Sequence, residues 1–316
     1  MGTIDRIAFG PVPSRRLGQS LGVNNIPPKA CSYSCVYCQQ GRTHNMQVRR
    51  RAFYEPGDVL QEVQAKIERV RALGPIDFLT FVPDGEPTLD VNLGREIALL
   101  RPLGIPIAVI SNASLISRED VREDLARADW VSLKIDSTSE EVWRRVDRPH
   151  RALRLLPVLD GMLEFARSYK GKLVTETMLV QGVNDGEEQL RELASFLAQL
   201  GPAYAYLAIP TRPPAEAWVH APGEEIIVRA YQLLSERVEH VEYLIGYEGN
   251  AFAFTGDPEG DLLSITAVHP MREEAVGEFL ARAGGNWLTV YELIAQGQLV
   301  ETEYGGHKFY MRRFRR

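Results

Sequence analysis

The chain has 316 residues, of which 45% are hydrophobic and 25% charged, and its formal net charge is −6. This composition is typical of a globular protein with one large and one small domain. The acidic balance excludes a surface that attracts nucleic acid throughout. No apolar run approaches the ~20 residues needed to cross a bilayer, and the first residues lack the apolar core of a signal peptide. We therefore expect a cytoplasmic protein with no membrane partner.

Strands and helices alternate along most of the chain. After a segment rich in Pro and Gly (3–19), short apolar runs predict strands near Ser20–Ile26, Ile76–Val82, Ile105–Ile110, Trp130–Ile135, Lys172–Val180, Ala203–Ile209 and Val241–Ile245. Apolar residues at helical spacing fill the intervals, which indicates parallel strands joined by right-handed crossovers. The six βα units are too few to close an eight-unit barrel. The pattern predicts an α/β fold, a partial (β/α)6 barrel of TIM type, over residues 1–245.

The pattern changes beyond this barrel. Residues 246–268 are predicted to form a connector that ends in a short strand, Leu262–Val268. Residues 269–316 then predict two helices, Met271–Ala283 and Trp287–Gln296, and a β-hairpin over 298–312. This order, with basic residues at its end, resembles a winged-helix domain. The alternative is a helix–hairpin cap packed on the open side of the barrel.

All three cysteines of the chain, Cys31, Cys35 and Cys38, lie in the stretch ACSYSCVYCQQG, directly after the first predicted strand of the barrel. Pro27 and Pro28 precede it and favour a loop. Three thiolates are one ligand short of a closed all-cysteine zinc site. An iron–sulfur cube held by three cysteines instead keeps one iron open for a ligand that is not protein. The loop therefore predicts a reactive iron–sulfur cluster.

The C-x3-C-x2-C spacing, with Tyr37 before the last cysteine, resembles the signature of the radical S-adenosylmethionine enzymes. The resemblance implies that Cys31, Cys35 and Cys38 bind a [4Fe-4S] cluster whose open iron binds S-adenosylmethionine. It also implies a reducing electron donor such as flavodoxin or ferredoxin. An electron from the reduced cluster would cleave S-adenosylmethionine to methionine and a 5′-deoxyadenosyl radical, which abstracts hydrogen from the substrate. The chain would then be an iron–sulfur oxidoreductase.

Polar residues that follow the next two strands extend this resemblance. Gly85-Glu86-Pro87 is similar to the family's G-E-P motif, which binds the amine of S-adenosylmethionine, although Asp84 stands where a first glycine is common. Ser111 and Asn112 end the third strand and resemble the family's polar turn near the methionine carboxylate or the ribose. The cysteine loop and the G-E-P motif also occur in the expected order.

The fourth and fifth strands carry further candidates. Alternation places Lys134 and Asp136 on one face, and charges inside a parallel strand must be paired or line a wet cavity. Asp136 is a candidate to hold ribose hydroxyls. Lys134 is a candidate catalytic residue, and the alternative is a structural ion pair with Asp136 or Glu176. Glu176 and Met178 share a face and lead to Asn184, in a turn that resembles the family's glycine turn near adenine.

Two longer stretches, PVPSRRLGQSLGVN and LLSITAVHPM, resemble a branch grouped with wyosine-type tRNA-modifying enzymes. No cysteine remains for a second cysteine-bound cluster. Our first hypothesis is an enzyme that modifies RNA, most simply a tRNA base, with the basic tail and the winged-helix-like domain on the phosphates. The second is an activase or maturase that acts on a protein or peptide partner. A third is an iron–sulfur sensor that binds DNA, against which the G-E-P motif counts.

Overall fold

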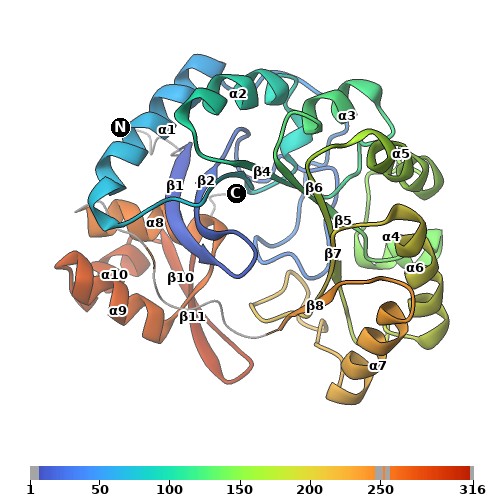
Figure 1. Cartoon of the computed structure of the whole chain (residues 1–316). Helices are drawn as coiled ribbons and strands as arrows, with labels where there is room; N and C mark the ends of the chain where they lie inside the picture. Colours follow the sequence, from blue (N-terminus) through green and yellow to red (C-terminus); the bar gives the residue numbers. More distant parts are fainter. Residues whose placement is uncertain (1–6, 246–251, 253–256, 314–316) are drawn as a thin grey trace.

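Eight strands lie in one sheet, in the order in which they occur along the chain. The computed structural model describes residues 7–245, 252 and 257–313. The strands are β1 (Ala8–Ser14), β2 (Gly18–Val23), β3 (Phe78–Phe81), β4 (Ile107–Ser111), β5 (Trp130–Lys134), β6 (Lys172–Met178), β7 (Tyr204–Ala208) and β8 (Val241–Leu244). Strands β2 to β8 are parallel, and β1 is antiparallel to β2. The sheet curls into a half-barrel (Figure 1).

Helices cover the outer face of the curled sheet (Figure 1). They are α1 (Pro56–Val70), α2 (Leu93–Leu100), α3 (Glu119–Leu125), α4 (Glu140–Val146), α5 (Leu155–Ser168), α6 (Glu187–Leu200) and α7 (Glu224–Ser235). In α6 the apolar stripe is buried against the sheet, and Gly201, in the left-handed conformation, ends the helix. On the sheet side, Leu79 and Phe81 of β3 are completely buried. The predicted α/β partial barrel is confirmed.

A first hairpin, absent from the sequence prediction, fills the amino-terminal mouth of the half-barrel. Strand β1 pairs with β2 from Ala8↔Val23 to Ser14↔Gly18. The hairpin tip places Leu17, only 2% exposed, in an apolar cluster that includes Trp130 and Tyr206. The Arg16 guanidinium lies 5.8 Å and 5.7 Å from the ring centroids of these two residues. The tip therefore closes the end of the barrel opposite the carboxyl ends of the strands.

A smaller unit, which we call the C-terminal module, comprises residues 257–313. Its elements are α8 (Pro258–Val268), β9 (Met271–Arg272), α9 (Glu273–Ala283), α10 (Trp287–Ala295), β10 (Leu299–Tyr304) and β11 (His307–Arg312). The three strands form a separate sheet in the order β10-β11-β9. Side chains from α8, α9, α10 and both strands of the hairpin share one buried apolar cluster. The two helices and the hairpin of the sequence prediction are present, and the winged-helix assignment stays a prediction.

The strand predicted over Leu262–Val268 is wrong, because these residues end helix α8. Pro258 occupies the first turn, and the Asp257 side chain accepts a hydrogen bond from the Gly260 N–H at 3.0 Å, which begins the helix. The described side chains from residue 261 to 267 are all buried. A helix buried on every side shows no amphipathic period, so its apolar run resembled a strand. Of the predicted connector, residues 246–251 and 253–256 lie outside the described residues.

Contacts from several elements hold the module on the half-barrel. Lys66 of α1 and Asp261 of α8 form an ion pair at 3.2 Å, with side chains 2% and 1% exposed. The Tyr304 hydroxyl donates to the carbonyl of Pro210 at 3.2 Å. Helix α8 also lies against β1. The module therefore sits beside β1 and reaches the loop after β7. No helix among the described residues is long and apolar enough to cross a membrane.

Candidate active site

The cysteine loop occupies residues 24–55, at the carboxyl end of β2. Cys31, Cys35 and Cys38 are free thiols, and each is partly exposed. The N–H of Cys38 donates to the carbonyl of Cys35 at 3.1 Å, and that of Gly41 to the carbonyl of Cys38 at 3.0 Å. The Lys29 ammonium donates to the Gly41 carbonyl at 2.6 Å and lies 3.7 Å from Cys38 Sγ. A cation therefore stands beside one of the predicted ligands.

The turn after β3 holds the cysteine loop through two backbone hydrogen bonds. The Lys29 N–H donates to the Asp84 carbonyl at 2.7 Å, and the Glu86 N–H donates to the Ala30 carbonyl at 2.9 Å. A Cβ atom on Gly85 would lie 2.0 Å from the Ala30 carbonyl oxygen, so only glycine permits this close approach. Gly85 is thus needed to position the loop, whatever else its backbone binds.

Glu86 is completely buried, and its carboxylate accepts four hydrogen bonds. The donors are the Thr88 N–H (3.0 Å) and hydroxyl (2.6 Å), the Ser111 hydroxyl (2.8 Å) and the Asn112 N–H (2.7 Å). Burial raises the pKa of Glu86, and these hydrogen bonds act to lower it. Pro87 is buried too, which leaves the glycine as the partly exposed residue of the motif. The carboxylate joins β3 to β4, and its predicted contact with an amine stays a prediction.

The end of β4 reaches the first cysteine through Asn112. Its side-chain amide nitrogen lies 3.6 Å from Cys31 Sγ and 3.1 Å from the Ser32 hydroxyl. Ser32 and Ser114 share a hydrogen bond of 2.6 Å, so the loop and the strand end are linked by side chains as well. Asn112 is partly exposed. Among the predicted cofactor-binding residues at this strand end, it is the one that touches a cysteine thiol.

A second network joins Cys35 to the end of β5. The Tyr37 hydroxyl donates to the carboxylates of Asp136 and of Asp147, at 3.1 Å for the latter, and the Cys35 thiol donates to Asp147 at 3.2 Å. Asp136 and Asp147 are 2% and 3% exposed. Burial raises the pKa of both carboxyls, and for Asp147 the charge of Asp136 raises it further. Asp136 thus lies at the carboxyl end of β5, as predicted, and its ribose-binding role stays a prediction.

Lys134 and Glu176 form an ion pair inside the half-barrel. The Lys134 ammonium lies 2.8 Å from Glu176, whose other oxygen accepts from Arg16 at 2.6 Å. Burial acts to raise the pKa of Glu176, but the two cations outweigh it and lower the pKa to about 2. The Lys134 ammonium also lies 4.8 Å from the ring centroid of Tyr37. The ion pair with Glu176 is the structural alternative that the sequence left open for Lys134. The catalytic role of Lys134 stays a prediction.

Asn184 joins the ends of β5 and β6. Its side chain is buried, accepts from the Val180 N–H at 2.8 Å and donates to the carbonyls of Asp136 (2.9 Å) and Met178 (2.8 Å). The Met178 N–H in turn donates to the Asp136 carboxylate at 2.7 Å. The hydrogen bonds of Asn184 are therefore made within the protein. Met178 is partly exposed, so its side chain is the more open of the two to a ligand.

The three thiols fit the ligand set of an iron–sulfur cube. Burial raises the pKa of Cys31 to about 12 and also raises that of Cys35, and the neighbouring cysteine charges add to both effects. Within the described part of the chain, no three Cys, His, Asp or Glu side chains surround one point as a single ion would require. A cube needs only one thiolate at each of three separate corners. The free thiols lie on one loop and their charges interact, and binding would displace their protons.

Sequence reasoning missed several groups that hold this site together. Asp147 follows α4 and carried no motif signal, because only the fold brings it to Cys35. Lys29 could have been noticed from its position two residues before the first cysteine. Glu216, from the loop after β7, is 6% exposed on its side chain and pairs with Arg42 at 2.6 Å and with Arg148. Long-range pairs of this kind leave no local pattern in the sequence.

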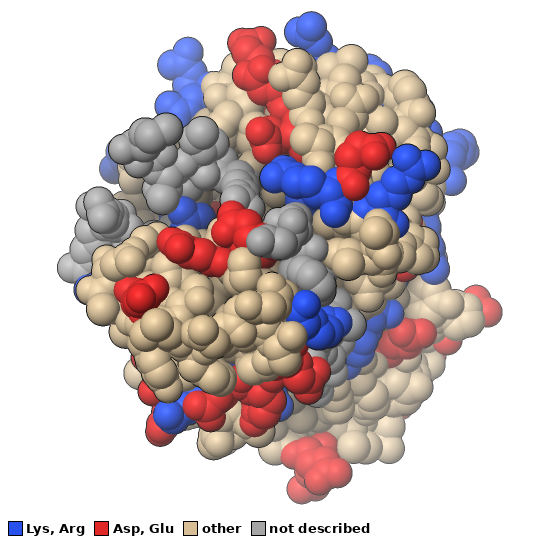
Figure 2. Space-filling model, turned by 90° about the vertical axis from the view of Figure 1, so that its left-hand side faces the viewer, with Lys and Arg blue, Asp and Glu red and all other residues tan. Residues whose placement is uncertain are grey.

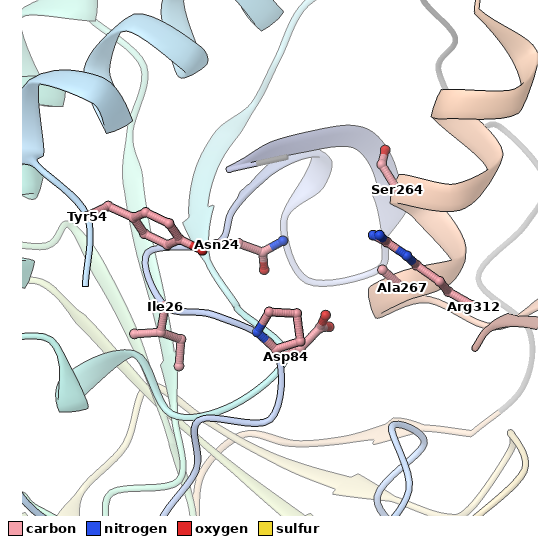
Figure 3. A pocket seen from close by; sticks show the side chains of 8 residues that line it. Asn24, Ile26, Tyr54, Asp84, Ser264, Ala267 and Arg312 are labelled. Carbon is pink, nitrogen blue, oxygen red and sulfur yellow. The ribbon is translucent and has the colours of Figure 1, made fainter. Parts of the chain in front are cut away.

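A small cleft, open to solvent, lies where the module meets the half-barrel (Figure 3). It is lined by Asn24, Ile26, Pro28, Tyr54 and Asp84 from the barrel side and by Ser264, Ala267 and Arg312 from the module. Figure 3 shows Asp84 and Arg312 on opposite sides of this space. Because Pro28 and Asp84 flank the segments that cross at Gly85, the cleft adjoins the candidate site.

Comparison with known proteins agrees with this geometry. Residues 25–194 match the family model described as the radical SAM superfamily. The chain is 47% identical, over 97% of its length and 96% of the relative, to UPF0026 protein MJ1312 of Methanocaldococcus jannaschii.

Two solved structures share the fold at low sequence identity. A radical SAM methyltransferase from Sphaerobacter thermophilus matches with a TM-score of 0.54 at 20% identity, over 73% of this chain and 69% of that one. A structure of TYW1 with a lysine-pyruvate adduct bound matches with a TM-score of 0.54 at 18% identity, over 74% of this chain and 78% of that one. The chain therefore belongs to the radical S-adenosylmethionine superfamily of enzymes and, by its sequence relatives, to the UPF0026 proteins.

Proposed function

We propose that Cys31, Cys35 and Cys38 hold a [4Fe-4S] cluster that binds S-adenosylmethionine and cleaves it reductively, so that a hydrogen atom can be taken from a substrate. The observation that carries this proposal is the crossing of the cysteine loop and the glycine turn, where Gly85 lies against the Ala30 carbonyl. When bound, the cluster supplies the electron for this cleavage, and a reduced flavodoxin or ferredoxin supplies it in turn.

The residues around the loop have distinct proposed roles. The backbone at Gly85 binds the methionine amine, because it is the exposed part of its motif. The Asn112 amide, 3.6 Å from Cys31 Sγ, and the Lys29 ammonium, 3.7 Å from Cys38 Sγ, stabilise charge at two thiolate ligands. Asp136 orients the ribose by accepting from its hydroxyls.

Anaerobic reconstitution tests the proposal. The protein should take up the iron and sulfide of one cube and, once reduced, convert S-adenosylmethionine to 5′-deoxyadenosine. Cys35→Ala should lose the cube, whereas Glu188→Gln, an exposed change on α6, should keep it. A full complement of cubane iron in Cys35→Ala, or no 5′-deoxyadenosine from the loaded protein, would refute the assignment.

For the substrate we propose an RNA base, with tRNA as the first choice. Arginines on the loops around the site support this choice, because phosphates bind guanidinium groups in pairs of hydrogen bonds. Arg151 and Arg154 are exposed on the loop before α5, whereas the Arg42 guanidinium already donates two hydrogen bonds to Glu216. Turnover with fractionated RNA should exceed the background without substrate, and the affinity for RNA should fall steeply with salt.

A polypeptide is the second candidate, with the enzyme acting as an activase or maturase. The charge of the C-terminal module favours it. Residues 257–313 contain nine Asp or Glu and five Lys or Arg, and acidic residues remain in excess when Arg315 and Arg316 are counted. Turnover with fractionated peptides under the same conditions separates the two candidates, because only the true substrate class raises 5′-deoxyadenosine above background.

A further inference from the structure

One face of the C-terminal module is apolar at its centre. On α10 the residues at positions 288, 291, 292 and 295 are exposed, at the spacing of one helix face. Leu288 and Tyr291 are each 59% exposed, which is high for large apolar side chains. Helix α10 contains no Lys or Arg. It therefore offers apolar contact and no group that binds a phosphate.

Acidic side chains lie next to this apolar centre. Glu301 and Glu303 are exposed on β10, and Glu292 is exposed on α10 itself. Lys308 of β11 stands opposite Glu303 and lies 3.5 Å from Glu301 and 3.8 Å from Glu273, so it neutralises part of this charge. The Tyr310 hydroxyl donates to Glu301 at 2.8 Å, and the Tyr310 ring lies 5.7 Å from the ring of Trp287, centroid to centroid. These contacts join β10 to α10 across the hairpin.

The aromatic row continues onto the exposed helix face. The rings of Trp287 and Tyr291 are 6.3 Å apart, so a chain of contacts runs from Glu301 through the buried Tyr310, which is 1% exposed, to Trp287 and the exposed Tyr291. Figure 2, which views the molecule from the side of the module, shows its lower lobe with an uncharged area bordered by many more red than blue side chains. We call the surface formed by Leu288, Tyr291, Glu292, Glu301 and Glu303 the acidic face.

We propose that the acidic face binds a basic segment of a partner polypeptide. Leu288 and Tyr291 would contact an apolar anchor, because tyrosine and other large side chains dominate the energy of interfaces. Glu292 and Glu303 would attract flanking Lys or Arg and orient the segment, whereas Glu301 is already paired with Lys308. The same carboxylates repel a phosphate backbone, so this face does not bind RNA. The proposal does not depend on the cluster, since binding needs only the folded module.

The probe is a short labelled peptide of alternating lysine and leucine, and the matched control peptide has glutamate in place of lysine. Fluorescence anisotropy with the full-length protein should show binding of the lysine peptide only, with affinity that falls as salt rises. Leu288→Ser combined with Tyr291→Ser should weaken binding by about tenfold or more. Glu292→Gln combined with Glu303→Gln should weaken it and flatten its salt dependence.

Controls separate this surface from general charge attraction. Glu188→Gln combined with Glu192→Gln removes the same charge from the outer face of α6 and should leave peptide affinity unchanged. Circular dichroism of each variant confirms that the module is folded. Equal affinity in the acidic-face variants and the wild type would overturn the proposal. So would tRNA that competes with the peptide at this face, or a dimer in sedimentation that Leu288→Ser alone dissociates.

Discussion

The buried ion pair between α1 and α8 should dominate the attachment of the C-terminal module. In Lys66→Met the side chain keeps a similar length but loses its charge, so the Asp261 carboxylate, 1% exposed, loses its ion pair with Lys66. Removing one partner of a buried pair typically costs about 3–5 kcal/mol. An exposed pair contributes far less: Arg191 and Glu187 on α6 are 52% and 53% exposed at 2.6 Å, and Arg191→Met should leave the free energy of unfolding nearly unchanged.

Urea unfolding monitored by hydrogen exchange measures both costs. The amides of α8 should lose protection by the same free energy that the Lys66→Met variant loses, because α8 carries Asp261, whose ion pair with Lys66 is broken. The double variant Lys66→Met/Asp261→Leu should recover most of the loss, since both charges of the pair are then removed. A loss below about 1 kcal/mol in Lys66→Met, or a double variant no more stable than the single one, would refute this reasoning.

Three further predictions concern the half-barrel. Gly85→Ala should abolish cluster loading, measured as bound iron, because its Cβ would meet backbone, whereas Gly57→Ala on α1 has open space around it and should load normally. The pKa of Glu176 falls from an ordinary 4.5 to about 2, which corresponds to about 3 kcal/mol of folding stability. This contribution is fully present above pH ~4.5 and is lost as the pH falls toward 2. Acid unfolding of Glu176→Gln should lack that dependence, and an unchanged acid profile would contradict the assignment. Tyr37→Phe removes the hydroxyl that donates to Asp136 and its neighbouring carboxyl, and should lower the free energy of unfolding by about 1–3 kcal/mol in urea titrations; an unchanged midpoint would show that the donor is not needed.

The half-barrel could be predicted because its strands are short buried runs between amphipathic helices, a pattern that local sequence carries. Strand β1 escaped prediction because Gly10, Pro11 and Pro13 interrupt it. It is an edge strand with an irregular register between Phe9 and Val12, where proline is tolerated. Helix α8 escaped because burial on all sides removed its period. Local pattern is therefore reliable only where one face of an element meets solvent or where both faces are buried in a short strand.

The candidate site divides in the same way. The cysteines and Gly85 were predictable, because ligand spacing and a close backbone approach are written in consecutive residues. The hydrogen-bond partners of Glu86 and Asn184 were not predictable, because the Glu86 carboxylate and the Asn184 amide bind strand ends that are far away in the sequence. No sequence motif indicated Asp147. Residues that support a site from a distance become visible only when the strands are brought to one edge.

The tip of the first hairpin closes the amino-terminal end of the half-barrel. Leu17, Trp130 and Tyr206 pack there, and Arg16 stands above them, tied to Glu176. Under the proposed function, cofactor and substrate would therefore enter and leave at the rim that carries the cysteines and not at this end. A short-lived radical formed at that rim would then lie between this packed apolar cluster and its substrate. The hairpin would thus shield this side of the site from solvent, and shortening it would also release Glu176 from its ion pair with Arg16.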